Sequence, residues 1–308
     1  MSQDVNGLLE VAKAAAAAGA AVLSRRQDST RHDPSLADPT LADPTLTDPT
    51  LTDPAQNDLP GSESSLDLAD VSNKSAAGDW VTAFDVAAEN AVRKSIRAAR
   101  PHDTITGEEH GTTRPENPSG LRWSIDPLDG TTNFIRNIVY YATSVAVADS
   151  DGVWLAGVVN APALGRVYYA ARGQGAWLEQ NGKRIQLTGP VPGRTGQILA
   201  TGFSYDPEVR AEQAAALGGF MDGFADMRRL GSAALDLCLV ADGTHDAFGE
   251  RGLNEHDFSA GALIAEEAGC WVRRPRLTSP LDGGPSDEER LAAWTCAGTL
   301  EMSGKFPL

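Results

Sequence analysis

Residues 123–134 read WSIDPLDGTTNF, an apolar run followed by two aspartates and a glycine–threonine turn. The apolar run predicts a short buried strand that ends at Asp126, after which Pro127 turns the chain and removes a backbone donor. Asp129 follows closely enough for its carboxylate and that of Asp126 to face one point. Gly130 then permits a close approach of the backbone to a ligand.

The two threonines that follow, Thr131 and Thr132, can begin a helix whose first N–H groups point outward as an anion site. Two carboxylates beside such a site suit Mg²⁺, which prefers oxygen ligands and often takes substrate phosphate as one of them. An aspartate pair that only forms a turn and caps a helix has the same local pattern. Acids elsewhere in the chain therefore decide between the two interpretations.

Three further acidic spots favour the metal-and-phosphate interpretation. Glu108 and Glu109 follow a predicted strand and turn that can aim a carboxylate inward. Asp79 precedes a short apolar run, and Asp257 begins an Ala- and Ile-rich helix, whose dipole favours a carboxylate at that end. Each acid alone is typical of a solvated surface or a helix cap, but the combination is uncommon.

The distribution of apolar residues indicates a layered protein built from helices and strands. Helical spacing and composition predict helices over residues 4–26, 79–100, 208–222, 231–242 and 257–269. Runs rich in Val, Ala and Tyr predict strands over 140–148, 153–160, 167–171 and 176–178, with strand ends near 197–202 and 245–249. Along the chain, a run of predicted strands is followed by alternating strands and helices. This order predicts a layered α/β (α+β) sandwich.

Residues 28–66 differ from the rest of the chain. Asp-Pro recurs every five residues from Asp33 to Asp53, and proline at that frequency excludes a helix or an interior strand. An acidic composition without aromatic residues cannot build a core. We expect a disordered or extended surface insert, either a neutral repeat expansion or a partner-binding segment.

Charge and apolar composition exclude several classes of protein. The net charge is −16, of which residues 28–70 carry −9, so neither part offers the basic surface that nucleic acids require. No apolar run approaches the roughly 20 residues that we expect of a membrane helix. The Ala-rich stretch near residues 14–23 has acids before it and a basic pair after it, the reverse of a secretory signal. We therefore expect a cytoplasmic protein without membrane or direct nucleic-acid partners.

Several segments resemble the signature blocks of the inositol monophosphatase family, in the family's order. The central block, residues 125–134, matches without a gap and is highly specific. The resemblance covers residues 4–26 and about 72–300, so only the acidic insert is foreign to it. The other matching blocks are DWVTAFD (79–85), GEE (107–109), ARGQGA (171–176), RLGSAALDLC (229–238), HDFSAG (256–261) and IAEEAG (264–269).

The resemblance implies a Mg²⁺-dependent phosphomonoesterase with defined metal ligands. Glu108, Asp126 and the backbone carbonyl of Leu128 would bind one Mg²⁺. Asp126, Asp129 and Asp257 would bind a second, and a third, weaker ion would lie near Glu108. This suits phosphoryl transfer, which needs positioning and charge neutralisation more than covalent help.

The resemblance also implies catalytic and substrate-binding residues. Thr131 and Asp79 would orient the metal-activated water for in-line attack, and Glu108 is the third catalytic residue. The amides of Gly130 and Thr131 would hold the phosphate. The substrate ring would be lined by Ser232, Ala233 and Glu250.

The fold that the resemblance implies is a layered αβαβα sandwich of the inositol monophosphatase and fructose-1,6-bisphosphatase type, usually a homodimer. Residues 1–27 would form the N-terminal helix of the catalytic domain, and residues 28–66 the acidic insert. Residues 67–190 would form an α+β half that carries the metal and phosphate motif. Residues 191–308 would form an α/β half with the substrate contacts and the last metal-binding aspartate.

One position departs from the family pattern. The family usually has Trp immediately before the last metal-binding aspartate, and this chain has His256 there. The change is either a tolerated substitution or one that alters metal affinity or its pH dependence.

The substrate that the resemblance favours is myo-inositol-1-phosphate, because Glu250 can accept hydrogen bonds from ring hydroxyls. A histidinol-phosphate phosphatase with the same fold and metals is the alternative. Phosphatases of substrates with two phosphates are disfavoured, since the sequence shows no added basic cluster. Some family members also act as interaction proteins in RNA synthesis, so a non-catalytic role is a further alternative, although the complete set of carboxylates argues against it.

Overall fold

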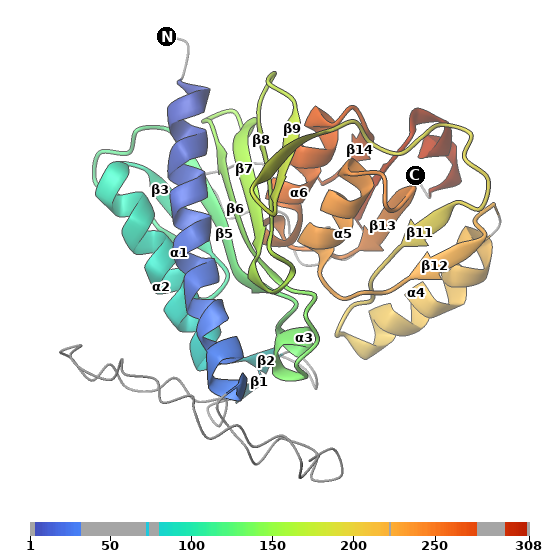
Figure 1. Ribbon diagram of the computed structural model, residues 1–308, viewed down its shortest axis with the longest axis horizontal. Helices are drawn as coiled ribbons and strands as arrows, with labels where there is room; N and C mark the ends of the chain where they lie inside the picture. Colours follow the sequence, from blue (N-terminus) through green and yellow to red (C-terminus); the bar gives the residue numbers. More distant parts are fainter. Residues whose placement is uncertain (1–3, 32–71, 74–79, 222, 276–292, 307–308) are drawn as a thin grey trace, which may run out of the picture.

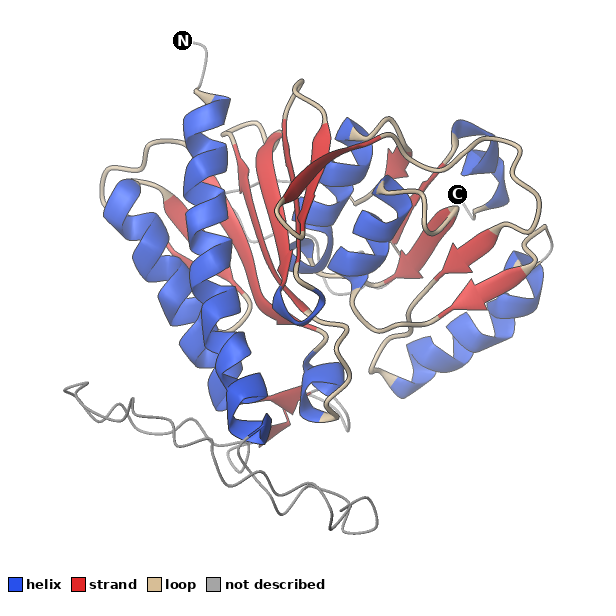
Figure 2. Cartoon of the chain, viewed as in Figure 1, coloured by secondary structure: helices blue, strands red, loops and turns tan. Residues whose placement is uncertain are grey.

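The computed structural model describes residues 4–31, 72–73, 80–221, 223–275 and 293–306 (Figure 1). Its elements stack in five layers, α, β, α, β and α, which confirms the predicted sandwich (Figure 2). Helices α1 (Val5–Arg31) and α2 (Ala83–Ala99) cover the outer face of a large sheet. Helices α5 (Ala233–Ala241) and α6 (Glu255–Glu267) lie between this sheet and a smaller one, and α4 (Pro207–Phe220) lies beyond the smaller sheet.

The large sheet has eight strands among the described residues, in the order β10-β9-β8-β7-β6-β5-β3-β4. Neighbouring strands are antiparallel except β3 and β5, which run parallel. The strands are β3 (Thr104–Gly107), β4 (Gly111–Thr113), β5 (Arg122–Asp129), β6 (Ala142–Ala148), β7 (Trp154–Ala161), β8 (Arg166–Ala171), β9 (Ala176–Gln180) and β10 (Lys183–Leu187).

The smaller sheet has five strands within the described ranges, in the order β12-β11-β13-β15-β14. Strand β11 runs parallel to both of its neighbours, and the remaining pairs are antiparallel. The strands are β11 (Ile198–Ala200), β12 (Asp226–Arg228), β13 (Ala247–Arg251), β14 (Trp271–Arg273) and β15 (Trp294–Gly298). The short elements are β1 (Ser72–Asn73), β2 (Trp80–Val81), α3 (Thr131–Ile135) and the 3₁₀ turns Pro162–Leu164 and Leu300–Lys305.

Helix α1 corrects two expectations from the sequence. By length and composition its segment Val5–Arg26 is apolar enough to cross a membrane, contrary to our expectation. Its apolar stripe, which includes Leu8 and Ala12, is instead buried in the core against the large sheet. The helix also continues to Arg31, past the predicted start of the acidic insert, whose residues 32–66 lie outside the described residues.

Helix α6 is packed between the two sheets, and small residues make this possible. A Cβ at Gly157 of β7 would lie 3.0 Å from the Cα of Ala260, so strand and helix are in close contact there. A Cβ at Gly261 would lie 2.9 Å from the carbonyl oxygen of Ala234 on α5. The close packing holds α6 against β7 and α5, and α6 also contacts β5.

Candidate active site

Strand β5 carries an irregularity that brings two aspartates to the same cleft. Its pairing with β6 shifts register between Asp126 and Asp129. The sequence predicts that the strand ends at Asp126, but it continues through a bulge at Pro127, where the missing proline N–H is tolerated. Thr143 on β6 donates its hydroxyl to the carbonyl of Pro127 at 2.9 Å. Asp126 and Asp129 consequently line one cleft.

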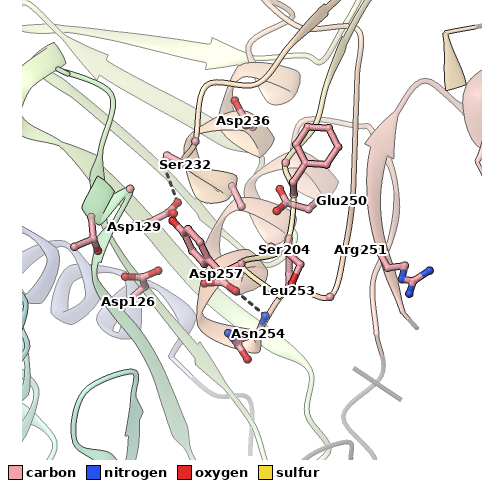
Figure 3. Close-up of a pocket in the computed structure, with 18 of the residues that line it drawn as sticks. Asp126, Asp129, Ser204, Ser232, Asp236, Glu250, Arg251, Leu253, Asn254 and Asp257 are labelled. Atoms are coloured by element: carbon pink, nitrogen blue, oxygen red, sulfur yellow. Dashed lines mark hydrogen bonds between the residues drawn. The ribbon is translucent and has the colours of Figure 1, made fainter. Parts of the chain in front are cut away.

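Hydrogen bonds hold both carboxylates of the bulge. Asp126 Oδ1 accepts from the backbone N–H of Leu128 at 3.0 Å. Asp129 Oδ2 accepts from Ser232 Oγ at 2.7 Å (Figure 3) and from the N–H of Ala234, also at 2.7 Å. Ser232 is also the N-cap of α5, so one oxygen of Asp129 joins the large sheet to that helix. Among the described residues, the other oxygen of Asp129 has no hydrogen-bond partner and is available to a ligand.

Glu108 lies in the turn between β3 and β4. Its N–H donates to the carbonyl of Ile125 at 3.2 Å, which joins the turn to β5. The buried carboxylate of Glu89, on α2, accepts from the N–H groups of Glu109 at 2.7 Å and His110 at 3.2 Å. The carboxylate of α2 therefore shapes the turn that presents Glu108 to the cleft.

The first turn of α6 supplies Asp257 and His256. Asp257 Oδ2 accepts from the N–H of Asn254 at 2.6 Å, within a capping box (Figure 3). His256 Nε2 lies 3.4 Å from Asp257 Oδ1. Glu108, Asp126 and His256 each offer one ligand atom, and these three atoms lie within 4.8 Å of one another.

Gly130 connects the bulge of β5 to helix α3. It has a φ of +98°, in the left-handed region that favours glycine, and a Cβ there would lie 3.0 Å from the carbonyl oxygen of Tyr140. The helix that begins at Thr131 confirms the helix start expected from the sequence. Both residues line the cleft beside the carboxylates.

Thr131 is paired with Asp85, which is not among the site residues predicted from the sequence. Thr131 Oγ1 lies 3.1 Å from Asp85 Oδ1 and 3.0 Å from the carbonyl of Leu128. Asp85 Oδ2 accepts from the N–H of Thr82 at 2.8 Å and from its hydroxyl at 2.5 Å. Asp79, the predicted partner of Thr131, lies outside the described residues. The Thr-x-x-Asp capping-box spacing in the sequence was the available signal for Asp85.

The carboxylates perturb one another strongly. Burial raises the pKa of Asp126 well above its usual range, and repulsion from Glu108, Asp129 and Asp257 raises it further. Burial also raises the pKa of Asp129 to about 7, with repulsion from Asp257, although the hydrogen bond from Ser232 opposes the rise. Several acids so close together favour a bound cation, which would reverse this repulsion.

A cleft of about 460 Å³ extends from these carboxylates toward the smaller sheet. Glu250 of β13 and Asp236 of α5 lie along it, on the side away from Asp126 (Figure 3). Burial raises the pKa of both carboxyls well above their usual range, and repulsion between them contributes to the shift at Glu250. Tyr140 donates its hydroxyl to Asp236 Oδ1 at 2.7 Å, which fixes that side chain.

The structure brings nearly all predicted site residues together, with Asp79 as the exception already described. The oxygen-rich donors from β5, the β3–β4 turn and α6 fit a divalent cation. The predicted residues that line the cleft are Glu108, Asp126, Leu128, Asp129, Gly130, Thr131, Ser232, Ala233, Glu250 and Asp257.

A cleft with clustered carboxylates beside a glycine–threonine helix start defines a site for phosphate-ester chemistry. The sequence profile of the Inositol monophosphatase family matches residues 51–295, and the chain belongs to this family of phosphomonoesterases. The inositol-1-monophosphatase of Mycobacterium leprae is 42% identical over 214 residues, which cover 68% of this chain and 73% of that protein. The Nus factor SuhB of Escherichia coli K12 is 41% identical over 211 residues, covering 67% of this chain and 75% of the relative.

Solved structures agree with this assignment. The extragenic suppressor protein suhB of Bartonella henselae superposes with a TM-score of 0.71 at 27% identity, covering 96% of this chain and 95% of that one. The inositol monophosphatase of Anabaena gives a TM-score of 0.69 at 25% identity, covering 98% and 95%. The αβαβα fold expected from the resemblance is thus shown both by the layers and by these neighbours.

Proposed function

We propose that this chain is a Mg²⁺-dependent phosphatase that hydrolyses myo-inositol-1-phosphate to inositol and phosphate. The observation that carries the proposal is the meeting of acids from the β3–β4 turn, β5 and α6 at one end of a cleft, beside the Gly130–Thr131 turn. A relative at 42% identity that is named inositol-1-monophosphatase supports the choice of substrate.

The metal ligands in this proposal come from the residues that line the cleft. Glu108, Asp126 and the carbonyl of Leu128 would hold one Mg²⁺. Asp126, Asp129 and Asp257 would hold a second, with Asp129 kept in place by Ser232. When bound, the cations would neutralise phosphate charge and make water a stronger nucleophile near neutral pH.

The chain's own groups would position the substrate and move the proton. The N–H groups of Gly130 and Thr131, at the start of α3, would bind phosphate oxygens. The Thr131 hydroxyl would orient the attacking water, take up a proton of that water and pass its own proton to Asp85. As the ester O–P bond breaks, the leaving alkoxide would take a proton from solvent water. Burial raises the pKa of Asp85 to about 7, which suits a proton acceptor that works near neutral pH.

The far part of the cleft would receive the inositol ring. Glu250 and Asp236 present carboxyl oxygens there (Figure 3). Ser232 and Ala233 also line the cleft. Ring hydroxyls can donate hydrogen bonds to such oxygens, whereas a purely apolar group would leave them unpaired at a cost of about 1–3 kcal/mol each. The lining therefore suits a polyol.

A substrate panel tests this assignment. Phosphate release with Mg²⁺ would be measured for inositol-1-phosphate, histidinol phosphate, fructose-1,6-bisphosphate and adenosine 3′,5′-bisphosphate. We expect inositol-1-phosphate to give the highest kcat/KM and Asp126→Asn to abolish its turnover. A clear preference for histidinol phosphate would replace the proposed substrate, and absence of turnover in a folded, Mg²⁺-binding protein would refute the enzymatic proposal.

A second candidate function is an interaction role in RNA synthesis. The observation that favours it is the 41% identity to an Escherichia coli protein named Nus factor SuhB. Affinity capture with purified RNA polymerase, using the wild-type chain and Asp126→Asn, separates the two functions. Capture by both proteins supports an interaction independent of catalysis, and no capture by either removes this candidate.

A further inference from the structure

His256 lies close to Glu108 and Asp126, which line the metal end of the cleft. It is the second residue of α6, directly before Asp257. Its side chain is only 16% exposed, so it is not a freely solvated surface histidine. Its backbone carbonyl lies 3.5 Å from Ser144 Oγ on β6, which places it beside the bulge of β5.

The geometry of His256 relative to two carboxylates matches a shared ligand set. One ligand atom each from Glu108, Asp126 and His256 lie within 4.8 Å of one another. Metal–oxygen and metal–imidazole bonds of about 2.0–2.1 Å place two ligand atoms on one ion roughly 3–4.2 Å apart. The upper limit of 4.8 Å on the separations of the three atoms is close to that range. The three residues come from different elements, so the arrangement is not a by-product of local chain geometry.

The imidazole of His256 also lies near the carboxylate of Asp257. His256 Nε2 is 3.4 Å from Asp257 Oδ1, longer than the 2.7–3.2 Å typical of an N–H···O hydrogen bond. Metal-binding histidines commonly direct the ring nitrogen that does not bind the metal toward a neighbouring carboxylate, and here that nitrogen would be Nε2, which leaves Nδ1 for the metal. Proximity to Asp257 is therefore compatible with a ligand role.

We propose that His256 is a nitrogen ligand of the metal ion held by Glu108 and Asp126. A carboxylate and water site suits Mg²⁺, whereas imidazole suits first-row transition ions. His256 consequently shifts the metal preference of this site from Mg²⁺ toward ions such as Co²⁺ and Zn²⁺. The proposal rests on the metal site of the proposed function and adds a ligand to it.

The direct test is spectroscopic and does not require turnover. The full chain without a polyhistidine tag would be stripped of metal, loaded with one equivalent of Mn²⁺ and examined by pulsed EPR for coupling to ¹⁴N. We expect coupling in the wild type and its loss in His256→Gln. His110→Gln is the matched control, because His110 is an exposed histidine two residues from Glu108 and should leave the coupling unchanged. Absence of coupling in the wild type, or its persistence in His256→Gln, would overturn the proposal.

Calorimetric titration supplies the second readout. In His256→Gln, Co²⁺ binding should weaken by about tenfold or more, whereas Mg²⁺ affinity should change much less. An effect of this size is typical when a group that supports a metal ligand is lost. His256→Trp, which carries the family's usual residue, should behave like His256→Gln and guards against a folding defect in one variant. A parallel fall for Co²⁺ and Mg²⁺ would contradict the proposal.

The outcomes are separable from those of the proposed function. Nitrogen coupling without hydrolysis of any phosphate ester would support His256 as a metal ligand and refute the proposed enzymatic function. Hydrolysis of inositol-1-phosphate without nitrogen coupling would support the proposed enzymatic function and refute His256 as a metal ligand.

Discussion

Gly107→Ala should disturb the metal site through the turn that carries Glu108. A Cβ at Gly107 would lie within 2.8 Å of every atom of the Glu89 carboxyl group. Glu89 is fully buried and also accepts from Arg93 Nε at 2.6 Å, so its carboxylate cannot move aside without breaking contacts. The methyl group must therefore displace either Glu89 or the turn.

The loss of stability in Gly107→Ala can be estimated from the hydrogen bonds that the added methyl group would disturb. Glu89 accepts from two backbone N–H groups of the turn, and hydrogen bonds to a charged group contribute roughly 1.5–3 kcal/mol each. We expect the free energy of unfolding to fall by about 3 kcal/mol, which lowers Tm by roughly 6–12 °C in a domain of this size. Because Glu108 moves with the turn, Mg²⁺ affinity should fall by about 10–100-fold.

Thermal and urea denaturation, with Mg²⁺ titration calorimetry, measure both effects. Gly218→Ala is the matched control, because Gly218 is an exposed residue of α4 where an added Cβ would meet no other part of the described chain within 4 Å. That variant should be as stable as the wild type or up to about 1 kcal/mol more stable, since alanine favours helix. Wild-type stability and Mg²⁺ affinity in Gly107→Ala would refute the role given to Glu89.

The electrostatics of the site lead to three more predictions. Ser232→Ala removes a hydrogen bond that favours ionised Asp129, so calorimetry at pH 7 should show Mg²⁺ affinity about tenfold weaker, and unchanged affinity would contradict this. Burial raises the pKa of Asp129 to about 7, and Asp129 must lose its proton to bind a cation. The Mg²⁺ affinity of the wild type should therefore rise as the pH rises through about 7. An affinity that does not change with pH would contradict this prediction. Burial raises the pKa of Asp85 from 3.8 to about 7, so the folded protein holds the proton of Asp85 more tightly than the unfolded chain does. The stabilisation that results is fully present below pH 3.8 and is lost as the pH rises through 7. Urea denaturation of Asp85→Asn should therefore show a weaker decline of stability over that range, and kcat should fall at least about 100-fold.

Local sequence patterns predicted the parts of the site that are close in the chain. The run from Asp126 to Thr131 indicated paired carboxylates followed by a helix start, and the structure has both. Helix α6 appears two residues earlier than expected, at Glu255, because its capping box begins at Asn254. These features depend on neighbours in sequence, which the pattern contains.

Contacts between distant segments were harder to predict. Nothing in the spacing of Asp129 and Ser232 shows that they share a hydrogen bond, so Ser232 was expected only to line the substrate ring. The sequence does not identify Asp85 as the partner of Thr131, because the two residues meet only when α2 packs beside α3. Strand β15 inserts between β13 and β14 in an order that the local apolar pattern does not encode. Such pairings are set by packing rather than by local periodicity.

We propose that the carboxylates at the end of β5 support Mg²⁺-dependent hydrolysis of a phosphate monoester. The most direct measurement is phosphate release from inositol-1-phosphate as a function of Mg²⁺ concentration, for the metal-free wild type and Asp126→Asn side by side. We expect no release without Mg²⁺, saturable release as Mg²⁺ is added to the wild type, and none in the variant. Release that is independent of Mg²⁺, or equal release by Asp126→Asn, would contradict it.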